Sequence, residues 1–452
     1  MRNTKNAAPR KIHSLGVALA GLALAILTTA RASAAEPDLE ARVEALEAEL
    51  KELKAELAEQ RAAPRQAPPG LQTPAAPAPA VAGAPAVESA PAAMIAAADV
   101  RSPLSWFGYG ELNYSRPSDD PSQATFDLTR FVIGLEYQFD RSTRLVSEVE
   151  IEHAVSSAED PGEVEVEQAY IQRDLGGDWQ SNLGLFLMPS GLLNESHEPT
   201  RYYGVFRNFV ETSIIPTTWR EGGADFRAQT ARGWRFDFGV TTGFDLSRWD
   251  PESTEGLESP LGSIHQELAL ARAADLSFLT AVDYTGVPGW RLGASVFSGN
   301  ADQGQPGFHD NRVTLWEGHV RWQGAGWELS ALYASGHISG TGSVNQEYVD
   351  LYAAPTLIPE NFYGWYLEGA WRGLIGRRWP LVPFLRYERF NTASAYARLP
   401  SGLTPAARPV QNAVTGGLQW EFAPGVMLKA DYVDFTNGAD GDRFDLGLGY
   451  AF

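Results

Sequence analysis

The sequence predicts an all-β transmembrane barrel of sixteen antiparallel strands, preceded by a short N-terminal α-helical coiled coil. Three observations support this prediction: segments of strict period-two alternation, regularly spaced turns, and an export signal at the start of the chain. The closing stretch RFDLGLGYAF shows the alternation, because every second residue from Phe444 to Phe452 is a large apolar or aromatic one. Such a segment suits a barrel strand that turns one face to lipid and the other to the interior.

The export signal occupies residues 1–34. A basic start is followed by the apolar run Leu15–Leu27, which is too short for a stop-transfer helix, and by the small residues Ala32–Ala34. The sequence contains no cysteine, so the exported chain has neither disulfides nor a cysteine-linked lipid anchor. We expect the signal to be cleaved and the mature protein to reach the bacterial outer membrane.

Two further segments lie between the signal and the strands. Residues 36–61 predict a coiled coil of about three heptads, with a single amphipathic helix as the alternative. Its seam is Leu39, Val43, Leu46, Leu50, Leu53 and Leu57. So short a coil is weakly stable alone and would form more readily between barrels that already associate. Residues 62–104 are rich in alanine and proline and predict a semi-extended linker.

Residues 105–452 divide into sixteen alternating segments. Seven short turns, such as Asp140–Ser142 and Gly324–Gly326, alternate with eight longer polar links. This asymmetry is typical of bacterial outer-membrane barrels, in which the long loops face outward. Apolar residues such as Ile133, Leu135 and Tyr137 form one face of a segment, and polar residues form the other. A soluble sandwich of two stacked sheets would share this local pattern and is the alternative fold.

The net charge of the chain limits the kinds of molecule that it is expected to bind. The formal net charge is −20, which argues against nucleic acid, since proteins neutralise phosphates with lysine and arginine. Outer-membrane lipid and small hydrophilic solutes or inorganic ions remain as the expected partners.

The longest link, Met188–Gly223, is the third of the long loops and is unusually apolar. It carries Tyr202, Phe209 and Trp219 among other large side chains, which an outer loop in water would leave exposed. We therefore expect it to fold into the barrel and form a constriction; closure over the mouth or packing between subunits are the alternatives. The candidate constriction residues are Glu195, His197, Glu198, Arg201, Arg207 and Arg220.

Stretches of this middle third resemble the phosphate-selective porin O and P family. They are Gly162-Glu-Val-Glu-Val-Glu-Gln-Ala-Tyr170, Asn194-Glu-Ser-His-Glu-Pro199, Tyr203-Gly-Val, Ile215-Pro-Thr-Thr-Trp219 and Glu221-Gly-Gly. The similarity covers the barrel from about Phe107 to Phe452. The resemblance implies a sixteen-stranded homotrimeric porin, with a third loop that narrows a water-filled channel for small solutes, including anions such as phosphate.

Charged residues of inward parity are the candidates for the pore lining. They are Arg130, Glu148, Glu150, Glu152, Glu163, Glu165, Glu167, Arg235, Lys429 and Arg443. Selective anion porins of this family place arginines and a lysine cluster at the constriction, whereas Lys429 is the only lysine of this barrel. Charge rings of one sign decide which ions enter a channel. The six glutamates therefore predict a general channel that favours cations or has mixed selectivity, without a phosphate-specific site.

The sequence predicts no catalytic site, metal centre or cofactor. His197 lies near Glu195 and Glu198, but no helical HExxH pattern accompanies it, and no segment suggests a positioned Ser–His pair. The rival function is structural: the coiled coil would contact the cell wall, and the barrel would anchor it. Removal of Glu36–Ala98 distinguishes the two, because a tether would lose envelope attachment whereas a channel would keep conducting.

Overall fold

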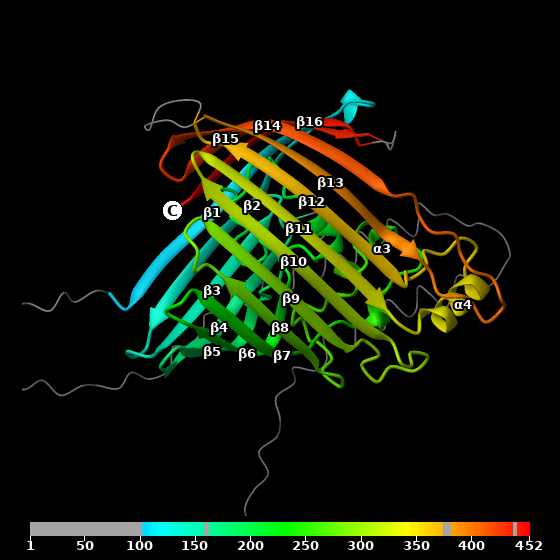
Figure 1. Cartoon of the computed structure of the whole chain (residues 1–452). Helices are drawn as coiled ribbons and strands as arrows, with labels where there is room; N and C mark the ends of the chain where they lie inside the picture. Colours follow the sequence, from blue (N-terminus) through cyan, green and yellow to red (C-terminus); the bar gives the residue numbers. More distant parts are fainter. Residues whose placement is uncertain (1–101, 158–161, 374–380, 437–440) are drawn as a thin grey trace, which may run out of the picture. The chain divides into compact units, whose positions relative to one another are not determined.

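The computed structural model describes residues 102–157, 162–373, 381–436 and 441–452 (Figure 1). The chain divides into two units, Met1–Ile95 and Ala96–Phe452, and the described residues all belong to the second. The predicted signal peptide, the coiled coil at 36–61 and the linker up to residue 101 lie outside the described residues. These predictions therefore remain predictions.

The described residues form a closed barrel of 16 antiparallel strands, as the sequence predicts. Each strand pairs with its neighbours in sequence, and β1 pairs with β16 from Tyr109–Ala451 to Pro117–Arg443. Because the sheet closes on itself, it is not a sandwich of two sheets. The strands are β1 Leu104–Pro117, β2 Thr125–Gln138, β3 Thr143–Glu152, β4 Val164–Gly176, β5 Trp179–Leu187, β6 Arg220–Gln229, β7 Trp234–Thr241, β8 Ser277–Tyr284, β9 Trp290–Asn300, β10 Arg312–Gly324, β11 Trp327–Ile338, β12 Asn361–Trp371, β13 Leu381–Ala395, β14 Gln411–Ala423, β15 Val426–Phe435 and β16 Arg443–Ala451.

Helical segments occur only in the long links of the described chain. They are η1 Pro121–Gln123, η2 Val210–Ile214, η3 Leu246–Arg248, α3 Glu255–Glu258, η4 Gly262–Ile264 and α4 Thr341–Leu351. None of these helices combines the length and the apolar character that crossing a bilayer requires.

The predicted short turns and long links separate the observed strands in the expected order. One boundary of the third link was wrong: the link, L3, covers residues 188–219, and Arg220–Gly223 already belong to β6. The ladder begins early because Arg220 and Glu221 pair with Leu187 and Phe186. The two glycines extend the strand, since Gly222 and Gly223 pair with Leu185 and Gly184. A Cβ at Gly222 would meet the Leu268 side chain.

The outer face of the barrel is apolar and carries aromatic pairs near both ends. Trp290 contacts Trp322, and Trp327 stacks on Trp371, beside the short turns; Trp316 packs on Tyr333 nearer the long loops. Aromatic rings at two levels around an apolar band are typical of barrels in a lipid bilayer. The alternation predicted for β2 is also observed, since Ile133 and Tyr137 are exposed and Gly134 is buried.

The interior of the barrel is more apolar than the sequence predicts. Toward the long loops, inward positions of β8–β15 are apolar and pack against L3 and against L4, the link of residues 242–276. Trp219 of L3 stacks on Phe244 of L4, and its edge meets Phe297 of β9. The alternation in the sequence predicts polar side chains on the inward faces. That holds for the turn end of the barrel, whereas the loop end encloses a hydrophobic core.

This core leads to a stability prediction. Trp219→Ala should lower the free energy of unfolding by about 3–5 kcal/mol, because it leaves a cavity beside Phe244 and Phe297. Trp420→Ala is the matched control, since Trp420 lies on the outer face and is 41% exposed, whereas Trp219 is fully buried. Urea unfolding in detergent measures both, and an equal loss in the two variants would contradict a packed interior core.

Candidate functional site

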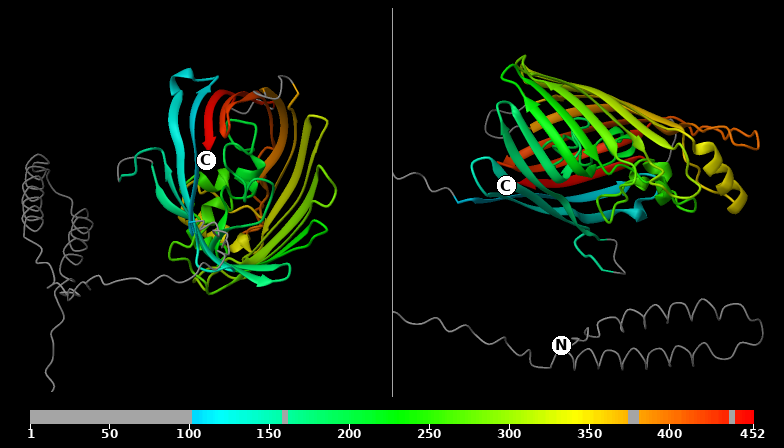
Figure 2. Two further views of the ribbon diagram at one scale, coloured as in Figure 1. Left: turned by 90° about the vertical axis from the view of Figure 1, so that its left-hand side faces the viewer. Right: turned by 90° about the horizontal axis from the view of Figure 1, so that it is seen from below.

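L3 folds into the barrel and contacts its wall on several sides. Figure 2 shows green segments of the chain inside the ring of strands. The contacts from residues 190–215 of L3 reach β1, β4, β6, β7, β9, β12, β13 and β15. A flexible link of this length keeps one path only if side chains of the wall hold it. Four such attachments hold L3.

The first attachment joins Glu195 to two wall arginines. Arg227 of β6 and Arg235 of β7 each place an Nη2 atom 2.7 Å from a carboxylate oxygen of Glu195. Asp237, fully buried between them, accepts from the Nε atoms of both arginines at 2.5 and 2.8 Å. Burial raises the pKa of Glu195, but the two guanidinium groups outweigh it and lower that pKa to about 2.

The second attachment centres on His197. Its Nε2 lies 2.7 Å from both a carboxylate oxygen of Glu167 and the Tyr109 hydroxyl, and its Nδ1 lies 2.9 Å from the carbonyl oxygen of Asn194. Arg130 donates to the carbonyl oxygen of His197 at 2.6 Å and pairs with Glu111 at 2.7 Å. These groups tie the loop to β1, β2 and β4. Arg130 and His197 are thus brought together as part of the loop anchor.

The third attachment uses Lys429 and Asp431 of β15. Lys429 donates to the carbonyl oxygens of Tyr202 and Gly204 at 2.9 and 2.8 Å, and Asp431 accepts from the backbone N–H of Val205 at 2.6 Å. The prediction that Lys429 lines a water-filled pore was wrong, since the side chain is buried beneath the loop. The physical reason is that two backbone carbonyls and the Tyr202 ring, 3.8 Å from the ammonium, replace water around the charge.

The fourth attachment holds the middle of L3 with two buried glutamates. Glu388 of β13 accepts from the backbone N–H of Phe209 at 2.6 Å. Glu211, within the loop, accepts from the N–H groups of Leu192 and Leu193 at 2.6 and 2.8 Å, and from the Tyr366 hydroxyl of β12 at 2.9 Å. Glu211 thereby links its own part of L3 to residues 192–193 of the same loop, and it links L3 to the wall at β12.

The remaining candidates in or near L3 differ in their surroundings. Arg201 pairs with Glu198 at 3.7 Å and is largely exposed. Arg207 donates to the Thr218 hydroxyl at 2.9 Å and has no carboxylate within ion-pair distance among the described residues. Burial lowers the pKa of Arg207, and the neighbouring Arg130 lowers it further. Arg220 does not belong to L3, as noted above; at the start of β6 it pairs with Glu165 and with Glu267 of L4.

The six predicted carboxylates do not form one continuous inward row. Glu148, Glu150 and Glu167 are buried on the inner wall, and Glu165 is partly buried and paired with Arg220. Glu152 ends β3 and is half-buried, so it stands at the mouth. Glu163 was wrongly placed: it precedes β4 and is exposed. A bulge opposite Glu148 shifts the register, so that Glu167 and Gln168 are both buried and the simple alternation fails.

Arg443 of β16 follows its predicted inward parity. Its Nε lies 2.8 Å from Asp445, and its guanidinium lies over the rings of Phe206 and Phe209. Four further site residues were not among the predicted ones, although all have inward parity on their strands: Arg227, Asp237, Glu111 and Glu388. Parity alone could have named them as interior residues, but it contains no information on which part of L3 they meet.

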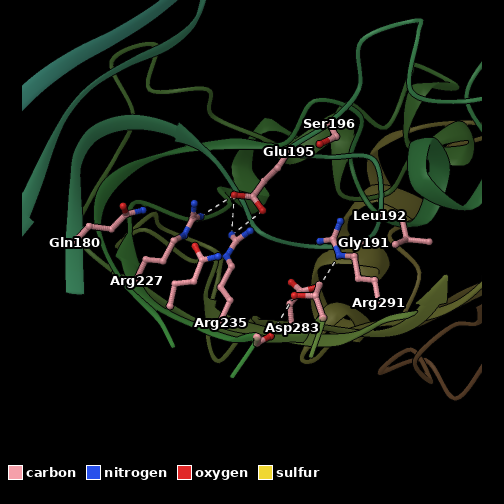
Figure 3. Close-up of a pocket in the computed structure, with 12 residues that line it drawn as sticks. Gln180, Gly191, Leu192, Glu195, Ser196, Arg227, Arg235, Asp283 and Arg291 are labelled. Atoms are coloured by element: carbon pink, nitrogen blue, oxygen red, sulfur yellow. Dashed lines mark hydrogen bonds and ion pairs between the residues drawn. The ribbon is translucent and has the colours of Figure 1, made fainter. Parts of the chain in front are cut away.

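A polar chamber of about 420 Å³ lies beside the first attachment (Figure 3). Glu195 reaches toward Arg227 and Arg235 on one side of it, and Arg291 pairs with Asp283 on the other at 2.7 Å. Gln180, Gln229 and Thr285 add neutral polar groups. The chamber has donors, acceptors and both signs of charge, which suits small hydrophilic molecules in water.

The low pKa of Glu195 predicts an acid-resistant tether. Because the folded-state pKa is depressed to about 2 from roughly 4.3, the ion pairs stabilise L3 fully above pH 4.3 and lose this contribution as the pH falls through 2. Single-channel current noise should therefore stay constant from pH 7 to about pH 4 and rise near pH 2. In Glu195→Gln the noise should be high throughout; a wild-type transition near pH 4.3 would contradict the pairing.

The third attachment predicts local loosening in a lysine variant. Lys429→Met keeps most of the side-chain length but leaves the carbonyls of Tyr202 and Gly204 unpaired, at a cost of about 1–3 kcal/mol. Chymotrypsin should then cleave after Tyr202 or Tyr203 faster than in the wild type. Arg312→Met, on the exposed outer face, is the control. Equal cleavage rates in Lys429→Met and the wild type would refute the role of the ammonium.

The chain was compared with protein-family models and with solved structures. No protein-family model matches the chain. Among solved structures, OmpF of Salmonella typhi aligns over 77% of this chain and 97% of its own, with a TM-score of 0.53 and 13% identity. A loop-deletion mutant of the Vibrio cholerae outer-membrane protein OmpT aligns over 77% and 99%, with a TM-score of 0.48 and 10% identity. The similarity to OmpF, together with the closed sheet, shows the fold of outer-membrane porins with 16-stranded barrels.

A sequence relative defines the family more closely. An uncharacterised protein of Aquifex aeolicus is 30% identical over 363 residues, which cover 78% of this chain and 81% of the relative. With the barrel and its inward-folded third loop already described, this similarity identifies the chain as a member of the same family as the Aquifex aeolicus protein.

Proposed function

We propose that the protein is an outer-membrane porin that lets small hydrophilic solutes and ions diffuse passively through the barrel. The observation that carries the proposal is the path of L3, which crosses the interior and is bound to opposite walls by Glu195, His197 and Lys429 contacts. A loop held in this way narrows an aqueous passage without a moving part. L3 is then the constriction of the channel.

The division of the interior supports a narrow passage. The apolar core fills much of the loop end of the barrel along β8–β15. Polar and charged groups line the other side and the turn end, including the 420 Å³ chamber beside Glu195. We infer that solutes follow the polar side, and that only small ones pass.

The paired charges support weak ionic selectivity. Family resemblance implies anions such as phosphate, but the lysine cluster has no counterpart, and Lys429 is buried under L3. Arg227, Arg235 and Arg291 are each paired with carboxylates, so no ring of one sign dominates the wall. We propose a general channel of mixed selectivity, in which Arg207 is a local cation without a carboxylate partner among the described residues.

Planar bilayer recordings test the proposal. Purified protein should produce stepwise, ohmic conductance in KCl, and millimolar phosphate should leave this current unchanged. Phosphate block at micromolar concentration would establish the anion-specific site that we argue against. A correctly folded barrel without conductance would refute the channel altogether. A variant lacking Glu36–Ala98 should conduct equally, whereas loss of envelope attachment without loss of conductance would add the structural role of the coil.

Arg207 predicts the sign of a selectivity change. Arg207→Glu should shift the reversal potential in a KCl gradient toward that of potassium, because a fixed positive charge in the passage becomes negative. Arg312→Glu makes the same change of charge on the outer face and should leave the reversal potential unaltered. Equal reversal potentials in Arg207→Glu and the wild type would place Arg207 away from the ion path.

A further inference from the structure

Two polar chambers adjoin each other on the inner wall at the turn end of the barrel. The first is the 420 Å³ chamber beside Glu195 (Figure 3), and the second, of about 430 Å³, is lined by residues of the β2–β3 and β4–β5 turns. Gln180 of β5 and Gln229 of β6 line both chambers. Each volume lies in the range of small-molecule sites in proteins. The shared residues make the two chambers one continuous polar surface.

The surface shared by the chambers is built from two glutamine–arginine pairs. Gln180 lies directly opposite Arg227 in the β5–β6 ladder, and Gln229 lies directly opposite Arg235 in the β6–β7 ladder. The Cβ atoms of residues in such positions are about 5 Å apart. We call these four residues the amide–arginine patch. Neutral amides and guanidinium groups are thus neighbours across three strands.

The charges around the patch are already compensated inside the protein. Both patch arginines pair with Glu195 and Asp237, and Arg291 across the first chamber pairs with Asp283. An ion that binds tightly here has to separate one of these pairs and loses the energy of that pair. The charged residues that line the second chamber are balanced in sign: Arg141, Arg144, Asp174 and Asp178.

The hydrogen-bonding groups of the patch are only partly used. Among the residues that the structure describes, neither the Gln180 amide nor the Gln229 amide has a hydrogen-bond partner. Within the same residues, the Nη1 atoms of Arg227 and Arg235 and both Nη atoms of Arg291 have no partner either. An amide group donates and accepts, whereas a guanidinium only donates. The patch therefore has unused groups of both kinds.

Hydroxyl groups match this set of unused donors and acceptors. A hydroxyl both donates and accepts hydrogen bonds, so a solute with several hydroxyls can bond to the free amides and Nη atoms without breaking an ion pair. Asp237 is fully buried and accepts from the Nε atoms of both patch arginines. It thereby holds the two guanidinium groups in place before a solute arrives. Such preorganisation lowers the entropic cost of binding.

We propose that the amide–arginine patch binds neutral polyhydroxylated solutes, such as sugars and sugar alcohols, as they cross the barrel. The inference rests on the proposed porin function and names a class of solute for it. The patch lies between Glu195 of L3 and the short turns, so a solute that follows the polar side of the interior contacts it.

Three solutes with the same carbon skeleton test the class of solute. Sorbitol is neutral, gluconate is an anion, and N-methylglucamine is a cation at neutral pH. In planar bilayers with the full chain, sorbitol should reduce the KCl conductance in a saturable way, with a half-saturating concentration at least about tenfold below that of either ion. Gluconate or N-methylglucamine that saturates at the same or a lower concentration than sorbitol would overturn the inference.

The same recordings separate this inference from the porin function. Stepwise conductance without a saturable effect of sorbitol would overturn the polyol site and leave the channel standing. A folded barrel without conductance would refute the channel itself, and the inference with it.

A double variant tests the residues. Gln180→Leu combined with Gln229→Leu removes both amides and keeps the arginines with their partners. Gln419→Leu is the control, because Gln419 lies on the inner wall at β14 and lines neither chamber. Swelling of liposomes measures sorbitol entry, and half-saturation should require at least about tenfold more sorbitol in the double variant, since each lost hydrogen bond contributes about 1 kcal/mol.

The controls make the comparison decisive. The KCl conductance of the double variant should equal that of the wild type, which shows that the barrel is folded, and Gln419→Leu should saturate as the wild type does. A folded double variant that saturates at the wild-type concentration would overturn the role of the amides. The solute series requires only the wild type, so it decides the inference independently of how the variants fold.

Discussion

Closure of the sheet, through the pairing of β1 with β16, is the constraint on which the rest of the structure depends. In a bilayer every backbone N–H and C=O must be paired within the protein, and a closed antiparallel sheet achieves this without a free edge. Closure also encloses an interior of limited width. L3 is longer than the strands it joins and is rich in aromatic side chains, so it buries them inside this space and competes there with water.

Several charged side chains of the wall hold that loop. Glu388 and Asp431 accept from backbone N–H groups of L3, Lys429 donates to its carbonyls, and Arg227 with Arg235 binds Glu195. Each charge meets an opposite charge or a backbone dipole, which compensates for the loss of water. The same pairing removes long rows of one sign from the passage. A strongly negative net charge, −20 for the chain, is thereby compatible with the weakly selective channel that we propose.

Most of the fold follows from local patterns. Period-two alternation and turn residues act over a few positions, so they predicted the number and order of strands before any long-range contact was known. The errors arose where local rules compete. At Glu167 a bulge breaks the alternation, so that Glu167 and Gln168 are both buried. Glu163 precedes β4 and is exposed, and at Arg220 two glycines that resemble a loop continue a strand that pairs with β5.

The sequence by itself predicted sixteen strands that suit an outer-membrane barrel, a third long loop too apolar for water, and most of the charges that point inward. Only the tertiary structure decided what those charges meet. Lys429 and Tyr202 are 227 residues apart, and Glu388 and Phe209 are 179 apart. Parity assigns a side chain to the inside of the barrel, but water and a folded loop are equally allowed partners there. The path of L3 selects between them, and that path results from many distant contacts acting together.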